Sequence, residues 1–286
     1  MSEQKKTVMV PYPSHAIVPE RDVNKKPVLE ARHLGVEFGG LKAVDDFNLI
    51  IGPTEIAGLI GPNGAGKTTI FNLITKVYQP TMGTILLDGK DTAGMNTIQV
   101  NKLGIARTFQ NIRLFGKLTV ADNVRIALHS QRKVKPWDVL LRTPRFRLDE
   151  QRMTGRVEDL LQLFKIDDKK DEVAANLPYG EQRKLEIVRA LAGNPSILLL
   201  DEPAAGMNPQ ETDELMKLIA FIRKEFSLTI LLIEHDMHLV MGICERLMVL
   251  DYGRIIASGT PDEIRSNPDV IKAYLGTDQT GGEVSL

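Results

Sequence analysis

The chain contains a glycine-rich segment of the form G-x-x-x-x-G-K-T, which reads Gly61-Pro62-Asn63-Gly64-Ala65-Gly66-Lys67-Thr68. A short apolar run, Ile56 to Ile60, precedes it, and a helix-compatible stretch, Thr69 to Tyr78, follows. In a strand, loop and helix of this order, backbone N–H groups converge on phosphate oxygens and the helix N-terminus adds favourable partial charge. The segment therefore predicts a phosphate-binding loop rather than an ordinary turn.

The residue types of this loop also predict how a nucleotide is held. We expect Lys67 to pair with the β- and γ-phosphates and the Thr68 hydroxyl to hold Mg²⁺. The predicted nucleotide-binding residues here are the loop and the next residue: Gly61, Pro62, Asn63, Gly64, Ala65, Gly66, Lys67, Thr68 and Thr69.

A second motif is an apolar run that ends in two carboxylates. Ile197 to Leu200 has the pattern of a buried strand and leads into Asp201 and Glu202. Asp201 at the end of such a strand suits Mg²⁺, directly or through water, and Glu202 can act as general base toward an attacking water. The alternative is a solvated acidic turn, which the presence of the phosphate loop makes less favourable.

Bulk properties exclude several classes of protein. The 286 residues suffice for one large domain or two modest ones, and the net charge of −1 gives no basic field that would point to nucleic acid. Cys244 is the single cysteine, which excludes a disulfide framework and fits a reducing compartment. No apolar run approaches the ~20 residues that cross a bilayer. We expect a cytoplasmic chain that partners hold at any membrane where it acts.

The pattern along the chain predicts an α/β protein with a helical insert. Residues 1–27 read as a flexible arm, and 277–286 as a tail. Short β-like segments alternate with turns from Val28 to about Leu87, and residues 113–187 are charged and mostly helical. Continuous apolar runs at 197–200, 228–233 and 247–250 predict strands covered on both faces. The helices expected among them are 210–225 and 237–245, with a capping box at Thr260 that begins another.

A further motif lies between the phosphate loop and the acidic strand: Leu177-Pro178-Tyr179-Gly180-Glu181-Gln182-Arg183. Here the chain resembles the ABC transporter ATPases, whose signature is L-S-G-G-Q followed by Q-R. Four residues fit: Leu177, Gly180, Gln182 and Arg183. Three depart: Pro178, Tyr179 and Glu181. The resemblance implies that Tyr179, Gly180 and Glu181 contact the γ-phosphate bound by a facing subunit, although Pro178 cannot supply the hydrogen bond of the usual serine.

Individual residues at family positions receive roles from the same resemblance. Gln110 resembles the glutamine that reaches Mg²⁺ and the attacking water, and His235 resembles the switch histidine at the γ-phosphate. Phe38 resembles the aromatic residue that stacks on adenine; a core phenylalanine is the alternative. Asn208 stands where the family usually has an aspartate that links the two subunits.

Longer strings resemble the ATP-binding subunits of branched-chain amino acid importers. They are residues 107–115, 178–186, 202–209, 233–237 and 267–276, and the similarity covers about 28–276. It implies an α/β P-loop NTPase with a RecA-like core, an antiparallel β subdomain and a helical subdomain at about 113–187 that carries the signature.

The resemblance also implies cofactors and partners. They are ATP with Mg²⁺, a head-to-tail dimer with a sister ATPase or with itself, two transmembrane permease subunits that dock at residues 111–115, and indirectly a periplasmic or surface solute-binding protein. The location implied is the cytoplasmic face of the plasma membrane. Alternatives are a related amide or urea importer, a non-transport ABC ATPase, a P-loop kinase and a pure binding module.

One basic segment stands apart from these motifs. Residues 131–147 hold six lysines or arginines against one acid, Asp138, with Trp137, Leu140, Leu141 and Phe146 interleaved. Two interpretations stay open. The segment is a solvated helical hairpin with its own small core, or it is a face near the membrane, where each basic residue gains ~1 kcal/mol from anionic head groups.

Overall fold

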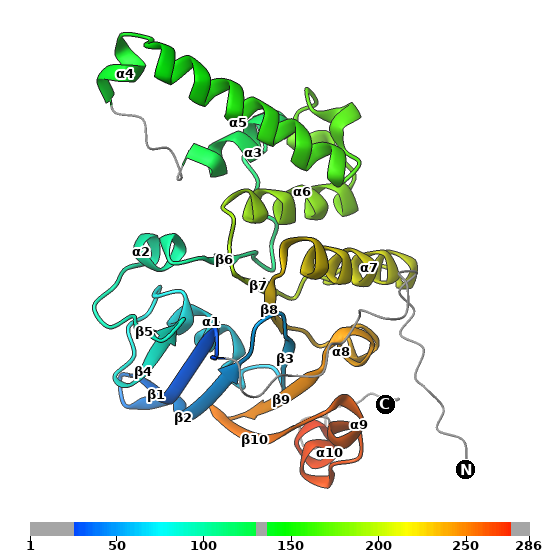
Figure 1. Cartoon of the computed structure of the whole chain (residues 1–286). Helices are drawn as coiled ribbons and strands as arrows, with labels where there is room; N and C mark the ends of the chain where they lie inside the picture. Colours follow the sequence, from blue (N-terminus) through cyan, green and yellow to red (C-terminus); the bar gives the residue numbers. More distant parts are fainter. Residues whose placement is uncertain (1–25, 130–135, 276–286) are drawn as a thin grey trace. The chain divides into compact units, whose positions relative to one another are not determined.

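The structure, a computed structural model, describes residues 26–129 and 136–275 in two compact units (Figure 1). The first unit comprises the described residues up to Arg107 and those from Ser196 onward, and the second runs from Thr108 to Pro195. The expected tail and all but the last two residues of the expected arm lie outside the described residues.

A mainly parallel sheet forms the centre of the first unit. Its described strands, in spatial order, are β10 (Arg254–Gly259), β9 (Arg246–Asp251), β3 (Ile56–Ile60), β8 (Thr229–Ile233), β7 (Ile197–Asp201) and β6 (Ile105–Arg107). Only β10 runs antiparallel to its neighbour in this described sheet. All five residues of β3, β7 and β8 are buried, as continuous apolar runs require in a sheet covered on both faces.

A second, antiparallel sheet packs in the same unit. Its order is β2 (Leu41–Ile51), β1 (Leu29–Phe38), β4 (Met82–Leu87) and β5 (Lys90–Asp91). Gly39 and Gly40 turn β1 into β2 with φ of 54° and 89°, a left-handed backbone that glycine adopts without strain. This sheet confirms the predicted antiparallel β subdomain, and the fold class is the predicted α/β class.

Helix α1 (Lys67–Ile74) shares one core with both sheets. Ile70, Phe71 and Leu73 join the hydrophobic cluster that also contains Leu59 of β3 and Phe47 of β2. The other described helices of this unit are α2 (Thr97–Lys102), α7 (Pro209–Phe226), α8 (Met237–Ile243), α9 (Pro261–Arg265) and α10 (Pro268–Leu275). Burial of α1 between two sheets fixes the start of this helix, and therefore the loop before it.

Side-chain caps define where α7 and α9 begin. Thr260 accepts a hydrogen bond from the backbone of Glu263, whose side chain accepts one from Thr260 N–H, so the predicted capping box is confirmed. Asn208 and Glu211 form the same reciprocal pair at α7. Proline stands at the first turn of both helices, where its missing N–H costs no hydrogen bond.

The second unit is helical. Its described helices are α3 (Val120–His129), α4 (Pro136–Leu140), α5 (Pro144–Leu163) and α6 (Tyr179–Ala192), with the 3-10 turns η1 (Asp167–Lys169) and η2 (Ala174–Asn176). Helix α3 packs against α5 and α6, and α4 packs against α5 (Figure 1). Among the residues that the structure describes, no helix has both the length and the apolar composition that crossing a membrane requires.

In the basic segment, residues 131–147, the structure does not show the small core that one of the two interpretations expected among the described residues. Helices α4 and α5 agree with the solvated helical part of the first interpretation, but Trp137, Leu140 and Leu141 are exposed instead of gathering into a small core. Three of the six basic residues, Arg132, Lys133 and Lys135, lie outside the described residues. The physical reason is the brevity of α4, whose five residues pack against α5 over too short a length to cover these apolar side chains.

Candidate nucleotide-binding site

The phosphate loop connects the buried strand β3 to helix α1, which begins at Lys67. Three loop glycines adopt positive φ: Gly61 (148°), Gly64 (81°) and Gly66 (106°). A Cβ on Gly61 would lie 2.0 Å from the carbonyl oxygen of Leu250, and one on Gly66 would lie 2.8 Å from that of Ala43. The glycines at 61 and 66 are therefore required by the approach of neighbouring backbone, whereas Gly64 faces open space.

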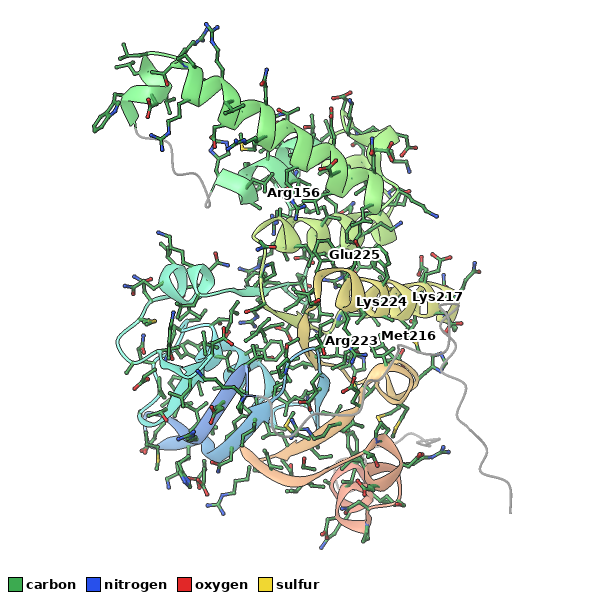
Figure 2. The ribbon with its side chains drawn as sticks, in the orientation of Figure 1. Arg156, Met216, Lys217, Arg223, Lys224 and Glu225 are labelled. Atoms are coloured by element: carbon green, nitrogen blue, oxygen red, sulfur yellow. The ribbon has the colours of Figure 1, made fainter. Side chains whose placement is uncertain are left out.

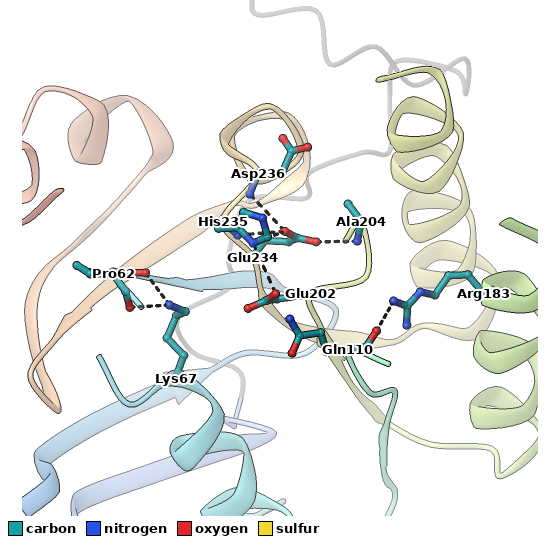
Figure 3. A network of polar contacts seen from close by, with 10 residues as sticks. Pro62, Lys67, Gln110, Arg183, Glu202, Ala204, Glu234, His235 and Asp236 are labelled. Carbon is teal, nitrogen blue, oxygen red and sulfur yellow. Dashed lines mark hydrogen bonds and ion pairs between the residues drawn. The ribbon is translucent and has the colours of Figure 1, made fainter. Parts of the chain in front are cut away.

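The Lys67 side chain folds over the loop that precedes it. Its ammonium donates hydrogen bonds to the carbonyls of Gly61 (2.6 Å) and Pro62 (2.9 Å) (Figure 3). Burial lowers the pKa of Lys67, and the carboxylates of Glu202 and Asp201 act in the opposite direction. The cation therefore lies in a partly dehydrated place beside two acids, where an anionic phosphate would interact strongly with it.

Three parallel strands bring two of the predicted catalytic residues, Glu202 and His235, to one edge of the sheet, whereas Gln110 belongs to the second unit. Strand β8 lies between β3 and β7, with Ile233 opposite both Leu59 and Asp201. The phosphate loop, the Asp201–Glu202 pair and the segment from Glu234 to Asp236 therefore follow neighbouring strand ends. Ligands of open α/β sheets bind outside the carboxyl ends of their strands, which is where these residues lie.

Asp201 is buried at the end of β7 and is paired with Arg107, for which the sequence predicted no role in the site. Its Oδ2 accepts a hydrogen bond from Arg107 Nη2 at 2.7 Å. The same guanidinium donates to Asn72 Oδ1 at 2.7 Å and lies over the ring of Phe71. Arg107 thus ties the acidic strand to helix α1.

Glu202 and His235 are neighbours at the strand ends. The Nδ1 of His235 lies 3.7 Å from Glu202 Oε2, and the two side chains are 63% and 18% exposed. Glu202 has φ of 43°, a left-handed conformation that costs a non-glycine residue energy. Its N–H donates to the carbonyl of Ile233 at 2.9 Å, which holds the residue in that conformation.

Glu234 is a buried carboxylate that braces the two loops. One oxygen accepts from Ala204 N–H (2.7 Å) and the other from the N–H groups of His235 (3.0 Å) and Asp236 (3.3 Å) (Figure 3). Burial raises the pKa of Glu234, and these backbone donors oppose the rise. The contact fixes the backbone on both sides of the Glu202–His235 pair, and nothing in a local motif distinguishes Glu234 from its acidic neighbours.

The oxygen ligands in this part of the site suit a magnesium ion that is bound partly by the protein and partly by the phosphates of a nucleotide. Thr68 is an exposed hydroxyl residue on the first turn of α1, and Asp201 supplies a carboxylate. Within residues 26–129 and 136–275, no three His, Cys, Asp or Glu side chains are grouped to hold a metal ion. This composition fits Mg²⁺, which proteins hold through one or two oxygen ligands together with substrate phosphates.

Phe38 ends strand β1 and is not a core residue. It is 44% exposed, and its ring meets that of Tyr78 edge to face, with centroids 5.2 Å apart. Tyr78, which follows α1, was not selected from the sequence because a single tyrosine after a helix carries no local signal. The two exposed rings form an aromatic pair in the unit that carries the phosphate loop.

The predicted signature residues begin helix α6 in the second unit. Pro178 is its N-cap and supplies no side-chain hydrogen bond, so the first-turn N–H groups of Tyr179 and Gly180 have no side-chain cap. A Cβ on Gly180 would meet nothing within 4 Å, and Tyr179 is exposed. Glu181 is held by Lys169, whose ammonium donates to both carboxylate oxygens at 2.5 and 2.6 Å.

Buried Arg183 joins this helix to the segment that contains Gln110. Its guanidinium donates to the carbonyl of Gln110 at 2.8 Å (Figure 3). It also donates to the carbonyl of Phe109 (2.7 Å) and to Glu186 Oε2 (2.8 Å). Glu186 in turn accepts from Arg113 N–H at 3.2 Å. The second unit therefore holds Gln110 and the N-terminal part of α6 in one polar network. Asn208, expected to link two subunits, serves as the N-cap of α7 in the first unit.

A contact from the C-terminal helix reaches the first residue of the phosphate loop. Burial raises the pKa of Tyr274 on α10 to about 12. A hydrogen bond from the backbone of Gly61 acts in the opposite direction and lowers this pKa. The contact was not anticipated, because the two residues are distant in sequence and belong to different motifs. It places α10 among the elements that fix the loop.

Comparisons with known proteins agree with this geometry. The model of the ABC transporter family matches residues 44–205, more than half of the chain, and that of the branched-chain amino acid ATP-binding cassette transporter matches residues 254–280. The high-affinity branched-chain amino acid transport ATP-binding protein LivG of Escherichia coli K12 is 49% identical over 88% of this chain and 98% of its own. BraF of Pseudomonas aeruginosa, which has the same descriptive name, is 46% identical over the same shares.

Solved structures give the same result. The ADP conformation of MJ1267, an ATP-binding cassette of an ABC transporter, has a TM-score of 0.77 and 28% identity, and the match covers 87% of this chain and 99% of that one. The fold and the loop define a P-loop ATPase cassette. The chain belongs to the ABC transporter family, as an ATP-binding subunit. The resemblance noted in the sequence is thereby confirmed.

Proposed function

We propose that this chain is the ATP-hydrolysing subunit of an importer for branched-chain amino acids. The observation that carries the proposal is the meeting of the phosphate loop, Asp201–Glu202 and His235 at the ends of neighbouring parallel strands. The solute is inferred from relatives, since LivG and BraF carry that substrate in their names and the C-terminal match has the same description.

The chemistry assigned to these residues is hydrolysis of the β–γ bond of ATP. Loop N–H groups and Lys67 bind the phosphates, and Glu202 takes the proton of a water whose oxygen attacks the γ-phosphorus. The bond from that phosphorus to the bridging oxygen breaks, giving ADP and phosphate. Thr68 and Asp201 would hold Mg²⁺, for which the family resemblance also implies Gln110, and the ion would supply positive charge at the phosphates.

His235 has a position consistent with an accessory role. The Nδ1 of its exposed ring stands 3.7 Å from the Glu202 carboxylate, and the other ring nitrogen, Nε2, would donate a hydrogen bond to a γ-phosphate oxygen. The Phe38–Tyr78 pair offers an aromatic surface on which an adenine would stack.

The assembly proposed is a head-to-tail dimer with a sister ATPase or a second copy. The exposed N-terminus of α6, at Tyr179, Gly180 and Glu181, would receive the γ-phosphate bound by the facing subunit. Two permease subunits would dock on residues 111–115, in which Phe115 is exposed and Arg113 lies over the Phe109 ring. A solute-binding protein would deliver the amino acid to those permeases.

Transport by the reconstituted complex tests the proposal. Proteoliposomes that contain this chain, its permeases and, where required, its sister ATPase should accumulate leucine when solute-binding protein and Mg-ATP are supplied. Glu202→Gln should still bind ATP while hydrolysis and uptake fall about 10²–10⁴-fold, the usual contribution of a general base. Glu225→Gln, the same change at an exposed position of α7, should match the parent (Figure 2).

The outcomes separate the alternatives. Hydrolysis at the parent rate by Glu202→Gln would remove Glu202 from its role. Uptake of urea or an amide in place of leucine would keep the ATPase mechanism and replace the proposed solute.

A further inference from the structure

The α4–α5 corner, defined as residues 137–148, presents large apolar side chains to solvent. Trp137, Leu140 and Leu141 are 58%, 82% and 72% exposed. Val139 and Leu148 are also exposed. The corner lies at the N-terminal end of α5 within the second unit (Figure 1). Scattered exposed apolar residues are ordinary, but five within twelve successive positions form a patch of the kind that marks an interaction surface.

The charge of the corner is as distinctive as its apolar content. Arg142, Arg145 and Arg147 are exposed in the same segment as the apolar side chains. The acid within the corner is Asp138, whose Oδ1 accepts a hydrogen bond from Thr143 Oγ1 at 3.0 Å. A net positive corner therefore stands on a chain whose overall net charge is −1.

We propose that the α4–α5 corner binds the anionic surface of a phospholipid bilayer. Tryptophan and leucine side chains enter the boundary between head groups and acyl chains, and arginines beside them pair with lipid phosphates while their stems cover apolar surface. A second copy that used the same corner would bring like charge against it, so charge disfavours a symmetric pair formed through this surface. The corner thus gives the subunit a lipid contact of its own, besides any held by partners.

Trp137 makes the proposal directly measurable, because it is the one tryptophan of the chain. The full-length protein is mixed with vesicles of phosphatidylcholine alone or of phosphatidylcholine enriched in phosphatidylglycerol, at low salt. Anionic vesicles should shift the Trp137 emission to shorter wavelength and carry the protein upward in flotation. Neutral vesicles should do neither, and added salt should reverse the effect because it screens the arginines.

Two variants separate the charged from the apolar contribution. The triple change Arg142→Gln, Arg145→Gln and Arg147→Gln should lower partitioning about 100-fold, since each basic residue at an anionic surface contributes roughly fivefold. Leu140→Ser with Leu141→Ser should also weaken binding. The matched control changes three exposed basic residues elsewhere in the unit, Arg156→Gln (Figure 2), Lys165→Gln and Lys170→Gln, and should retain binding.

Each contrary result overturns the proposal. Absence of a shift with anionic vesicles does so directly, and an equal loss in the control would mean unspecific attraction. An emission shift that appears only with purified permeases in detergent would assign the corner to a protein partner. A shift that grows with protein concentration without vesicles would assign it to a second copy. ATP turnover of the variants, which contain the intact phosphate loop, serves as the folding control.

Discussion

At the residue scale, the backbone around the phosphate loop is set by the carbonyl groups that approach it. The oxygens of Leu250 and Ala43 occupy the places where side chains at positions 61 and 66 would begin. Lys67 closes the loop from within through its hydrogen bonds to Gly61 and Pro62. The loop therefore has its shape from packing of neighbouring strands as well as from its own glycines.

Two alanine substitutions distinguish these causes. Gly61→Ala should lower the free energy of unfolding by about 3–5 kcal/mol, because its Cβ would collide with a backbone oxygen at 2.0 Å. Gly64→Ala, where φ is 81° but the space is open, should cost about 1–2 kcal/mol. Urea denaturation measures both. Equal losses would show that φ alone, and not the approach of Leu250, requires glycine at 61.

Local motifs account for what the sequence reveals at this scale. The loop residues and the Asp201–Glu202 pair are contiguous strings whose chemistry depends on their immediate neighbours. The Arg107–Asp201 pair joins residues 94 positions apart, and the Tyr274–Gly61 contact spans more of the chain. The Arg107–Asp201 pair becomes visible only when strands β6 and β7 are placed side by side.

At the element scale, a cluster of charges joins the end of α7 to the starts of β3 and β9. Arg223 (Figure 2) donates to the carbonyl of Thr54 at 2.5 Å and pairs with Glu245. Arg246 Nε donates to Glu55 Oε1 at 2.8 Å. Burial raises the pKa of Glu245 to about 7, and the negative charge of Glu55 adds to this rise. The positive charges of Arg223 and Arg246 act in the opposite direction.

This pKa gives the stability of the fold a predictable pH dependence. Because the folded pKa exceeds the usual 4.5, the folded chain binds more protons than the unfolded chain between these values. The stability that protonated Glu245 contributes to the fold is fully present below its pKa in the unfolded chain and is lost as pH rises through about 7. Between pH 4.5 and about pH 7 the unfolding free energy of the parent should fall as Glu245 loses its proton. Glu245→Gln should reduce that fall by about 1–3 kcal/mol. Urea denaturation at several pH values measures it, with Glu225→Gln as the exposed control; identical slopes would contradict the assignment.

Elements were predictable where every side chain is buried. The apolar runs at β3, β7 and β8 gave their positions to within a residue, because no polar face interrupts them. Strand β10 was missed, since its residues are exposed or half-buried and their pattern resembles a loop. The expected helix after the phosphate loop also began two residues late and ended late, because α1 starts at Lys67 and stops at Ile74.

At the scale of the whole molecule, the proposed mechanism requires that ATP join two subunits. Glu202→Gln should associate with its partner ATPase, or with itself, in Mg-ATP, because the γ-phosphate supplies charge-assisted bonds to both chains. With ADP the pair should separate. Sedimentation velocity reports both states.

The same measurement has a clear control. Gly180→Asp, added to Glu202→Gln in this chain, places a carboxylate at the N-terminus of α6, where it would repel the phosphate, while the open space around Gly180 admits the side chain. It should abolish association without loss of fold. If Glu202→Gln stays monomeric in saturating Mg-ATP with its cognate membrane complex present, the shared-nucleotide assembly is wrong.

The guanidinium of Arg183 has a mechanical consequence. By holding the carbonyls of Phe109 and Gln110 as well as Glu186, it couples the proposed permease-docking segment rigidly to the first turns of α6. If the permeases dock on residues 111–115 as proposed, a movement there would be carried to α6 through these hydrogen bonds. Because the amino end of α6 is the part proposed to receive the facing subunit's nucleotide, one buried side chain would then link a transport movement to the binding of ATP.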